Sequence, residues 1–555
     1  MHLDDLQRLA ATAPGHLNRR ELLILSGAAV VVAGCGGNGK SESSGAVRNV
    51  SGFSPGGGKE VAEVNWGIVG DAVGLDPLVA YDYQSVQPAF QAMDSILALN
   101  TKNELIPMLA ESWEQVDPLT YTYNIRSGVT FHDGSSLTAE DVAYSLNRHL
   151  DPKLGSYLIS FMASVREITS NGNNQVIVKL KQPDANWKFV PSIPVGLVVS
   201  KKNIEELLKA GKTPGTPNAL QIGSGPYKLV KWTKGSSVQL TRYDGYWNKE
   251  KPLKVKDLNF QVVTDAEAMA NGLINGELQG TFQLNGRAVQ PLKSRVQVLR
   301  SQSVNIRLLG FNAKVKPFDD PSVRQALSLA IDKPGLLESA YGGEGRLWNS
   351  PVEQNQWGFA KDTFSQAYED LPDYMTRDLD KAKSLITEAG AKGAKGNILA
   401  ATPEQQAQAV AVQAAGRDIG LNLTVEKVPS EQQVALMFTE DKERTYSLTM
   451  FDWGSDTPDP SGNLIVPFLS TNKVTNFMQY ENPKLDALLN EQIQMPDDEA
   501  RAKVIAEAQA LAVDDQVWSV LYWINNLTLL AKDIGGMRVI PTYPYWSWAA
   551  DLSGK

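Results

Sequence analysis

A single cysteine, Cys35, stands among 555 residues, and it directly follows a short apolar run that ends in residues 32–34, Val-Ala-Gly. Arg19 and Arg20 precede that run. A basic pair, a short apolar segment and small residues before a cleavage point are typical of a secretory signal. An exported chain whose sole cysteine lies at this point forms no internal disulfide. Its body must therefore be stabilised by packing alone.

The small residues before Cys35 resemble a bacterial lipobox, in which the cysteine thiol receives diacylglycerol and becomes the new N-terminus. We therefore expect residues 1–34 to be a lipoprotein signal peptide and Cys35 to carry the lipid. The apolar run is shorter than the ~20 residues that a membrane-spanning helix needs. Arg19 and Arg20 resemble a twin-arginine export signal, and the general secretory route stays open as well. Residues 35–59, which are rich in Ser and Gly, predict a flexible tether to the outer face of the cytoplasmic membrane.

Length and charge restrict the classes of function. A chain of 555 residues exceeds what one hydrophobic core usually supports, so two to four lobes are expected. The net charge is −9 and no run of five or six like charges occurs, which argues against a nucleic-acid partner. After removal of the signal only His132 and His149 remain as histidines, so a bare metal ion is not expected as a ligand. No cofactor is expected either.

Strand-like and helix-like segments alternate along the body of the chain. Thr138 and Asp320 stand at helix-capping positions, because their side chains can accept hydrogen bonds from the free backbone N–H groups of a first turn. This alternation predicts an α/β fold. Strands are expected at residues 64–69, 121–125 and 421–425, and helices at 84–97, from 138, from 321, at 380–389 and at 405–419.

Five segments together resemble one family, the extracytoplasmic solute-binding lipoproteins of peptide/nickel-type ABC transporters, which include the oligopeptide- and dipeptide-binding proteins. They occur in the order in which that family has them. The segments are LAESWEQVDPLTYTYNIRSGVTFHDGSSLTAEDVAYSLNR (109–148), GSGPYKLVKW (223–232), FNAKVKPFDDPSVRQALSLAID (311–332), DWGSDTPDP (452–460) and VLYWINNLTLLAK (520–532).

The resemblance implies a periplasmic-binding-protein-like clamp of two lobes (type II, cluster C) with an extra inserted domain. Two crossing strands near 308–312 and 520–523 would form the hinge, and a monomer would hold its ligand between the lobes and deliver it to permease and ATPase subunits. The implied parts are a first lobe at 60–100, 219–309 and 525–555, an inserted domain at 101–218, and a second lobe at 310–524.

The resemblance also implies an anchor for the ligand. In peptide-binding members the aspartate of a W-x-x-D segment accepts the α-ammonium group of the ligand, and Trp453 and Asp456 stand at these positions. A buried ammonium group needs a fixed anionic partner, which a carboxylate supplies through a charge-assisted hydrogen bond. From the residues alone, Asp456 could instead cap a surface turn. Asp459 is expected to shape the turn, and Asp452 to face away from Trp453, because neighbours on a strand alternate sides.

Further candidates for ligand contact lie in loops that approach the ligand in relatives, although simple packing would also explain them. His132 is expected to be structural. Met450 stands near the position where some peptide-binding relatives place an arginine, which puts the recognition of an anionic end in doubt. The further candidates are Tyr81, Asp82, Tyr83, Trp348 and Trp357.

The expected function is the capture of short peptides for an importer. A non-peptide solute such as an oligosaccharide, an opine or a metal chelate would use the same fold, and a sensing role is not separable from import. An exported hydrolase with an acidic site is the alternative from another class, since it needs only two carboxylates about 5–10 Å apart. The sequence contains no H-E-x-x-H or G-x-S-x-G motif, so we do not expect an enzyme.

Overall fold

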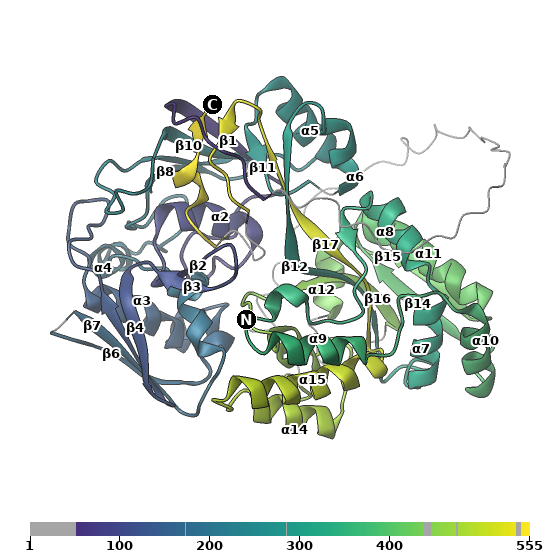
Figure 1. Ribbon diagram of the computed structural model, residues 1–555. Coiled ribbons are helices and arrows are strands. Elements are labelled where there is room, and N and C mark those ends of the chain that lie inside the picture. Colours follow the sequence, from purple (N-terminus) through teal and green to yellow (C-terminus); the bar gives the residue numbers. More distant parts are fainter. Residues whose placement is uncertain are drawn as a thin grey trace. The chain divides into compact units, whose positions relative to one another are not determined.

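The computed structural model describes residues 52–555 except 173, 285, 438–443, 445, 473–474 and 540–544 (Figure 1). Cys35 and the expected signal peptide lie outside the described residues. The compact unit described below lies within residues 48–555. None of its described helices has the length and apolar character needed to cross a membrane.

One large mixed sheet runs through this unit, and β13 (Gly345–Arg346) pairs with its strand β17 beside the main path. In spatial order the other strands are β15 (Asn422–Lys427), β14 (Lys395–Ala400), β16 (Leu448–Gly454), β12 (Gln297–Phe311), β17 (Trp518–Leu530), β11 (Gly280–Thr281), β1 (Val61–Ile68), β10 (Val255–Val262), β9 (Ser237–Arg242) and β8 (Tyr227–Thr233).

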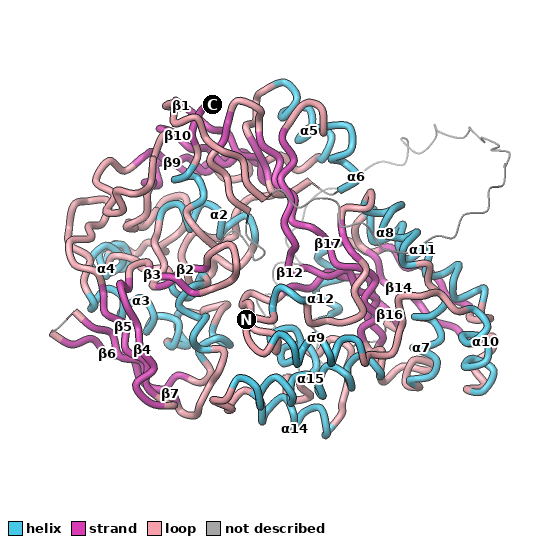
Figure 2. The backbone as a smooth tube through the Cα atoms, viewed as in Figure 1, coloured by secondary structure: helices cyan, strands magenta, loops and turns pink. Residues whose placement is uncertain are grey.

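The long antiparallel pair β12 and β17 connects the two halves of this sheet (Figure 2). Residues 297–302 of β12 pair with residues 525–530 of β17, and β11 joins the sheet at that end. After a register shift between Gln302 and Ile306, residues 306–310 pair with residues 518–523, and β16 joins β12 there. We call the part around β1, β8, β9 and β10 the first lobe and the part around β14, β15 and β16 the second lobe.

The first lobe shares one continuous core with a separate four-stranded sheet of order β4-β5-β7-β6. On β5 the side chains of Tyr121, Tyr123 and Ile125 are buried and alternate with more exposed ones, as expected for a half-buried strand. The strands of this part are β4 (Ala110–Asp117), β5 (Thr120–Ile125), β6 (Val165–Asn171) and β7 (Gln175–Leu180), with the pairs β2 (Leu97–Leu99) and β3 (Leu105–Pro107), and β18 (Ile534–Gly535) and β19 (Ser553–Gly554). Its helices are α2 (Tyr83–Ala92), α3 (Ala139–Leu150), α4 (Lys201–Lys209), α5 (Ala266–Asn275) and α6 (Gly286–Val289).

Helices cover both faces of the sheet in the second lobe (Figure 1). Leu309 and Met450 belong to the core on one face, and their strand neighbours Leu308 and Phe451 belong to the core on the other. The first face carries α7 (Pro321–Ala330), α8 (Lys333–Tyr341), α10 (Leu379–Glu388) and α11 (Pro403–Asp418). The second carries α9 (Lys361–Glu369), α12 (Ser430–Met437), α13 (Gly462–Phe468), α14 (Pro483–Gln492) and α15 (Asp498–Asp514).

Most of the expected local structure is present. Thr138 forms a capping box with Asp141 at the start of α3, and Asp320 caps α7. For the helix expected at 84–97 the predicted end is wrong, because α2 ends at Ala92 and residues 97–99 form β2. The apolar residues that continued the helical spacing are core residues of the turn and the strand, and apolar spacing alone does not distinguish these states.

The expectation of a flexible tether is wrong for residues 52–59. Ser54 is buried, and its backbone N–H donates to Met537 O at 2.9 Å. The N–H groups of Gly57 and Lys59 both donate to Gly554 O, at 3.0 and 3.2 Å. Glycine in this segment allows close approach to the C-terminal strand as well as flexibility, because it has no Cβ.

Candidate functional site

The segment from Phe451 to Pro460 carries three carboxylates, and two of them are paired with arginines. Asp452 lies opposite Arg307 in the ladder between β16 and β12, and its Oδ1 is 2.5 Å from Arg307 Nη1. Glu404, at the start of α11, lies 3.4 Å from Arg307 Nε. Trp453 pairs with Ile306 instead and lies on the opposite face, so the expected alternation of Asp452 and Trp453 is confirmed.

Asp459 is fully buried and forms the second pair. Its Oδ2 and Oδ1 accept hydrogen bonds from Nη1 and Nη2 of Arg501, each at 2.8 Å. Ser461 N donates to the same carboxylate at 2.9 Å, which shapes the turn as expected. Burial raises the pKa of Asp459, but the Arg501 charge and these hydrogen bonds outweigh burial and leave the pKa below its ordinary range. Asp459 is therefore structural.

Asp456 differs from both neighbours because its partner is neutral. Its Oδ1 accepts a hydrogen bond from the Tyr545 hydroxyl at 2.6 Å, and the carboxyl is partly buried. Within the described ranges it forms no ion pair with a Lys, Arg or His side chain. Burial raises the pKa of Asp456, and the hydrogen bond from Tyr545 only partly opposes that rise. A buried carboxylate with one neutral donor is an incompletely compensated anion, and a cationic ligand group would complete it.

Trp453 lies beside this carboxylate in the sequence and packs against the second lobe. Its ring contacts Phe477 and Trp518 edge-on, with centroid distances of 5.7 and 5.5 Å. Its Nε1 is buried and has no hydrogen-bond partner in the part of the chain that the structure describes. Nε1 of the buried Trp357 is in the same state, so this observation does not separate packing from ligand contact, and contact of Trp453 with a ligand remains a prediction.

The three candidates at the start of α2 have different surroundings. Asp82 is the N-cap of α2, where Oδ1 accepts from Gln84 N at 3.1 Å and from Ser85 N at 2.9 Å. Tyr81 is 53% exposed and lies edge-on to Tyr157. Tyr83 is more enclosed, and burial and then the nearby Tyr341 of the second lobe raise its pKa. Tyr83 therefore lies where the two lobes approach each other. The carboxylate of Asp82 instead caps the helix.

Trp348 and Trp357 belong to an aromatic cluster of the second lobe. Trp348 stacks on Tyr368 with a centroid distance of 3.7 Å, and its Nε1 donates to Val352 O at 2.7 Å. Trp357 is also buried, and its ring centroid lies 5.6 Å from that of Trp348. These contacts favour the packing interpretation of both tryptophans, and a role in ligand contact remains a prediction.

Each histidine of the body has a ring nitrogen within hydrogen-bond distance of a neighbouring group. Nε2 of His132 lies 2.9 Å from Gly225 O, and burial lowers the pKa of His132 to about 4. Nδ1 of His149 lies 2.7 Å from Ser156 Oγ, and burial lowers its pKa to about 3. Both rings are neutral structural groups at ordinary pH. No cluster of three or more His, Cys, Asp or Glu suited to a metal ion occurs among the described residues.

Tyr545 is the residue of this site that sequence reasoning missed. It lies 89 positions from Asp456, and no spacing rule relates the two. The aromatic density of residues 543–548, Tyr-Pro-Tyr-Trp-Ser-Trp, was a signal of packing or ligand contact, but not of this partner.

The sequence is similar to those of known proteins. The model of the bacterial extracellular solute-binding proteins, family 5 Middle, matches residues 104–475. Heme-binding protein A of Haemophilus influenzae is 28% identical over 444 residues, which cover 75% of this chain and 78% of that protein. The probable di/tripeptide-binding protein 5 of Pseudomonas aeruginosa is 27% identical over 465 residues, which cover 79% of this chain and 86% of that protein.

A solved structure supports the fold independently. The ABC transporter-associated periplasmic binding protein DppA of Helicobacter pylori, in complex with the peptide STSA, superposes with a TM-score of 0.77 at 20% identity. The match covers 90% of this chain and 99% of that chain. This confirms the expected α/β fold of two lobes. The relatives are substrate-binding proteins rather than enzymes.

Proposed function

Because the chain belongs to the bacterial extracellular solute-binding proteins of family 5, we propose that it captures short peptides between its two lobes for an ABC importer. The observation that carries the proposal is the state of Asp456. Of the three carboxylates of its segment, Asp452 and Asp459 have arginine partners, and Asp456 is bonded to a neutral tyrosine. The free α-ammonium group of a peptide is the missing cation.

The energetic argument rests on desolvation. An ammonium group that enters a closed site loses hydration, and a fixed carboxylate offsets that loss only if it is not already neutralised. A charge-assisted hydrogen bond contributes about 1.5–3 kcal/mol, which corresponds to roughly 10–100-fold in affinity. Backbone groups of the peptide would be held as in an added strand, and side chains would lie in hydrated pockets, which gives broad tolerance of peptide sequence.

A non-peptide solute is the second candidate, because the relative with 28% identity is named for heme binding. Heme has propionate groups and no ammonium group, so it would place carboxylates next to Asp456. The site therefore favours a ligand with a primary amine, and hemin serves as the comparison ligand in the test.

The proposal predicts that Asp456→Asn binds trialanine at least about tenfold more weakly than the native chain in titration calorimetry. Native protein should likewise bind N-acetyl-trialanine more weakly than trialanine, because acetylation removes the charge. Asp452→Asn is the matched control from the same segment, since this carboxylate is 47% exposed and already paired with Arg307. Equal affinity for the free and the acetylated peptide, or tighter binding of hemin than of trialanine, would contradict peptide capture through Asp456.

We also propose that the chain is lipidated at Cys35 and held at the outer face of the cytoplasmic membrane, where permease and ATPase subunits receive its ligand. This part rests on the lipobox-like residues before Cys35. Cys35→Ser should move the protein from the membrane fraction to the medium or the periplasm. Continued fractionation with membranes would show that the anchor lies elsewhere.

A further inference from the structure

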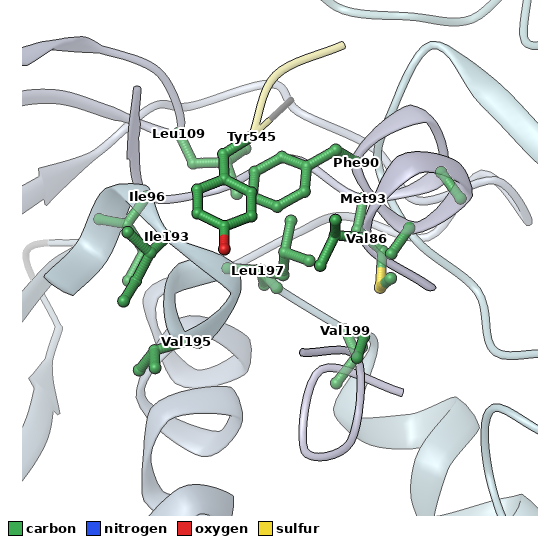
Figure 3. Close-up of a cluster of buried hydrophobic side chains, with 14 of the residues drawn as sticks. Val86, Phe90, Met93, Ile96, Leu109, Ile193, Val195, Leu197, Val199 and Tyr545 are labelled. Carbon is green, nitrogen blue, oxygen red and sulfur yellow. The ribbon is translucent and has the colours of Figure 1, made fainter. Parts of the chain in front are cut away.

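The hydrogen bond between Tyr545 and Asp456 joins the two lobes. Asp456 follows β16 of the second lobe, whereas Tyr545 belongs to the core of the first lobe. The ring of Tyr545 is only 4% exposed and stacks on Phe90 of α2, with a centroid distance of 5.4 Å and an interplanar angle of 21°. Figure 3 shows the two rings side by side, with Ile193 and Leu197 of the same lobe close to them. The ring is thus fixed in the first lobe, and its hydroxyl reaches the second.

The geometry leaves half of the carboxylate available. Oδ1 of Asp456 accepts the tyrosine hydrogen bond, and Oδ2 has no hydrogen-bond partner among the described residues. A carboxylate accepts hydrogen bonds at both oxygens. A neutral phenol therefore orients the carboxylate and leaves its charge in place, whereas an arginine at the same position would neutralise that charge. The pair presents an oriented anion, and one of its oxygens could accept a cation because it has no partner in the described part of the chain.

We propose that Tyr545 is a positioning residue that couples closure of the two lobes to recognition of the ligand's ammonium group by Asp456. The inference rests on the proposed function. In the closed arrangement the hydroxyl fixes the carboxylate and compensates part of its lost hydration. In an open arrangement water takes that role, and the carboxylate turns freely. Tyr545 therefore favours closure, and it does so most strongly when Asp456 is ionised.

The coupling has a signature in the pH dependence of binding. Burial raises the pKa of Asp456, and the hydrogen bond from Tyr545 lowers it. In the described part of the chain no other titratable or charged side chain, from either lobe, shifts this pKa. Removal of the hydroxyl therefore raises the pKa further. Protonated Asp456 cannot pair with an ammonium group, so peptide binding should fail at a higher pH in a variant without the hydroxyl.

The test uses Tyr545→Phe, which keeps the ring stacked on Phe90 and removes only the hydroxyl. Trialanine affinity, measured by calorimetry from about pH 4.5 to about pH 8, should fall about tenfold near neutral pH. The acidic midpoint of binding should also move to higher pH. In an Asp456→Asn background the same change should have little further effect, because the two groups act as a unit. Tyr243→Phe is the matched control, since its hydroxyl lies within hydrogen-bond distance of Thr130 and Phe131.

A second measurement separates this inference from the proposed function. Spin labels at Lys209→Cys on α4 and Glu491→Cys on α14, both exposed positions, report the separation of the two lobes in protein that also carries Cys35→Ser. Tyr545→Phe should lengthen the mean distance in ligand-free protein. If native protein fails to bind trialanine while the distance lengthens, the peptide assignment is wrong and the coupling stands. An unchanged distance together with an unchanged pH profile of binding overturns the inference.

Discussion

Lys333 is a buried amine without a hydrogen-bond partner among the described residues. It lies in the first turn of α8, and its side chain is fully buried. Burial lowers the pKa of Lys333 to about 7, and the charge of Asp373 opposes that shift. Below about pH 7 the Lys333 amine is therefore charged in the interior of the protein. This buried charge lowers the free energy of unfolding.

Lys333→Met should therefore stabilise the protein, by about 1–3 kcal/mol near pH 6. The folded pKa of Lys333 lies below the unfolded value of 10.5, so the native chain gains stability from this group as pH rises from about 7 to 10.5. The advantage of the variant should shrink over the same interval. Thermal unfolding at several pH values measures both effects, with exposed Lys361→Met as the control. A variant less stable than the native chain near pH 6 would mean that packing around the lysine stem outweighs the charge.

At the scale of elements, α2 shows how a candidate ligand residue becomes a structural one. The sequence places Asp82 between two tyrosines in a loop, which is equally suited to a ligand contact and to a helix cap. The structure assigns the cap, because Asp82 accepts from the N–H groups of Gln84 and Ser85. An N-cap stabilises a helix by satisfying backbone donors that have no partner within the helix.

Asp82→Ala should lower the free energy of unfolding by about 1 kcal/mol. Asp82→Asn should preserve it, since asparagine caps helices equally well and differs only in charge. Denaturant unfolding of both variants separates capping from charge. Trialanine affinity should be retained in Asp82→Asn. A large loss of affinity in that variant would show that the charge of Asp82 serves the ligand after all.

At the scale of the whole unit, contacts away from β12 and β17 also join the lobes. The N–H of Ala185, which follows the four-stranded sheet, donates to Ile493 O after α14 at 2.8 Å. Nδ2 of Asn103 donates to Asn355 O at 3.0 Å. A hinge motion about β12 and β17 would break both hydrogen bonds and that of Tyr545, whereas the sheets within each lobe would keep theirs. In the described arrangement all three hydrogen bonds between the lobes are formed.

The amide of Ala185 consequently reports closure. We predict that saturating trialanine slows its hydrogen exchange by about tenfold or more, because the ligand populates the state in which the amide is bonded. The amide of Leu180, which donates to Leu119 O at 2.7 Å within the first lobe, should change little. Exchange measured by mass spectrometry or NMR checks both positions. Equal exchange at Ala185 with and without peptide would contradict closure on binding.

Local sequence determined much of this protein by itself. Thr138 and Asp320 identified helix starts because capping depends on residues within one turn. The opposite faces of Asp452 and Trp453 followed from the two-residue period of a strand. The resembling segments between residues 109 and 532 predicted the family and the two-lobed fold, which the family match and the structural likeness confirm.

Only the tertiary structure decided which aspartate has no cationic partner among the described residues. Asp452, Asp456 and Asp459 are nearly equivalent in the sequence, and their partners come from distant positions. Arg307 reaches Asp452 through strand pairing, Arg501 reaches Asp459 from a helix, and Tyr545 reaches Asp456 from the other lobe. Capping and strand alternation act between neighbours in the chain, whereas the compensation of a buried charge depends on whichever groups the fold brings within hydrogen-bond distance.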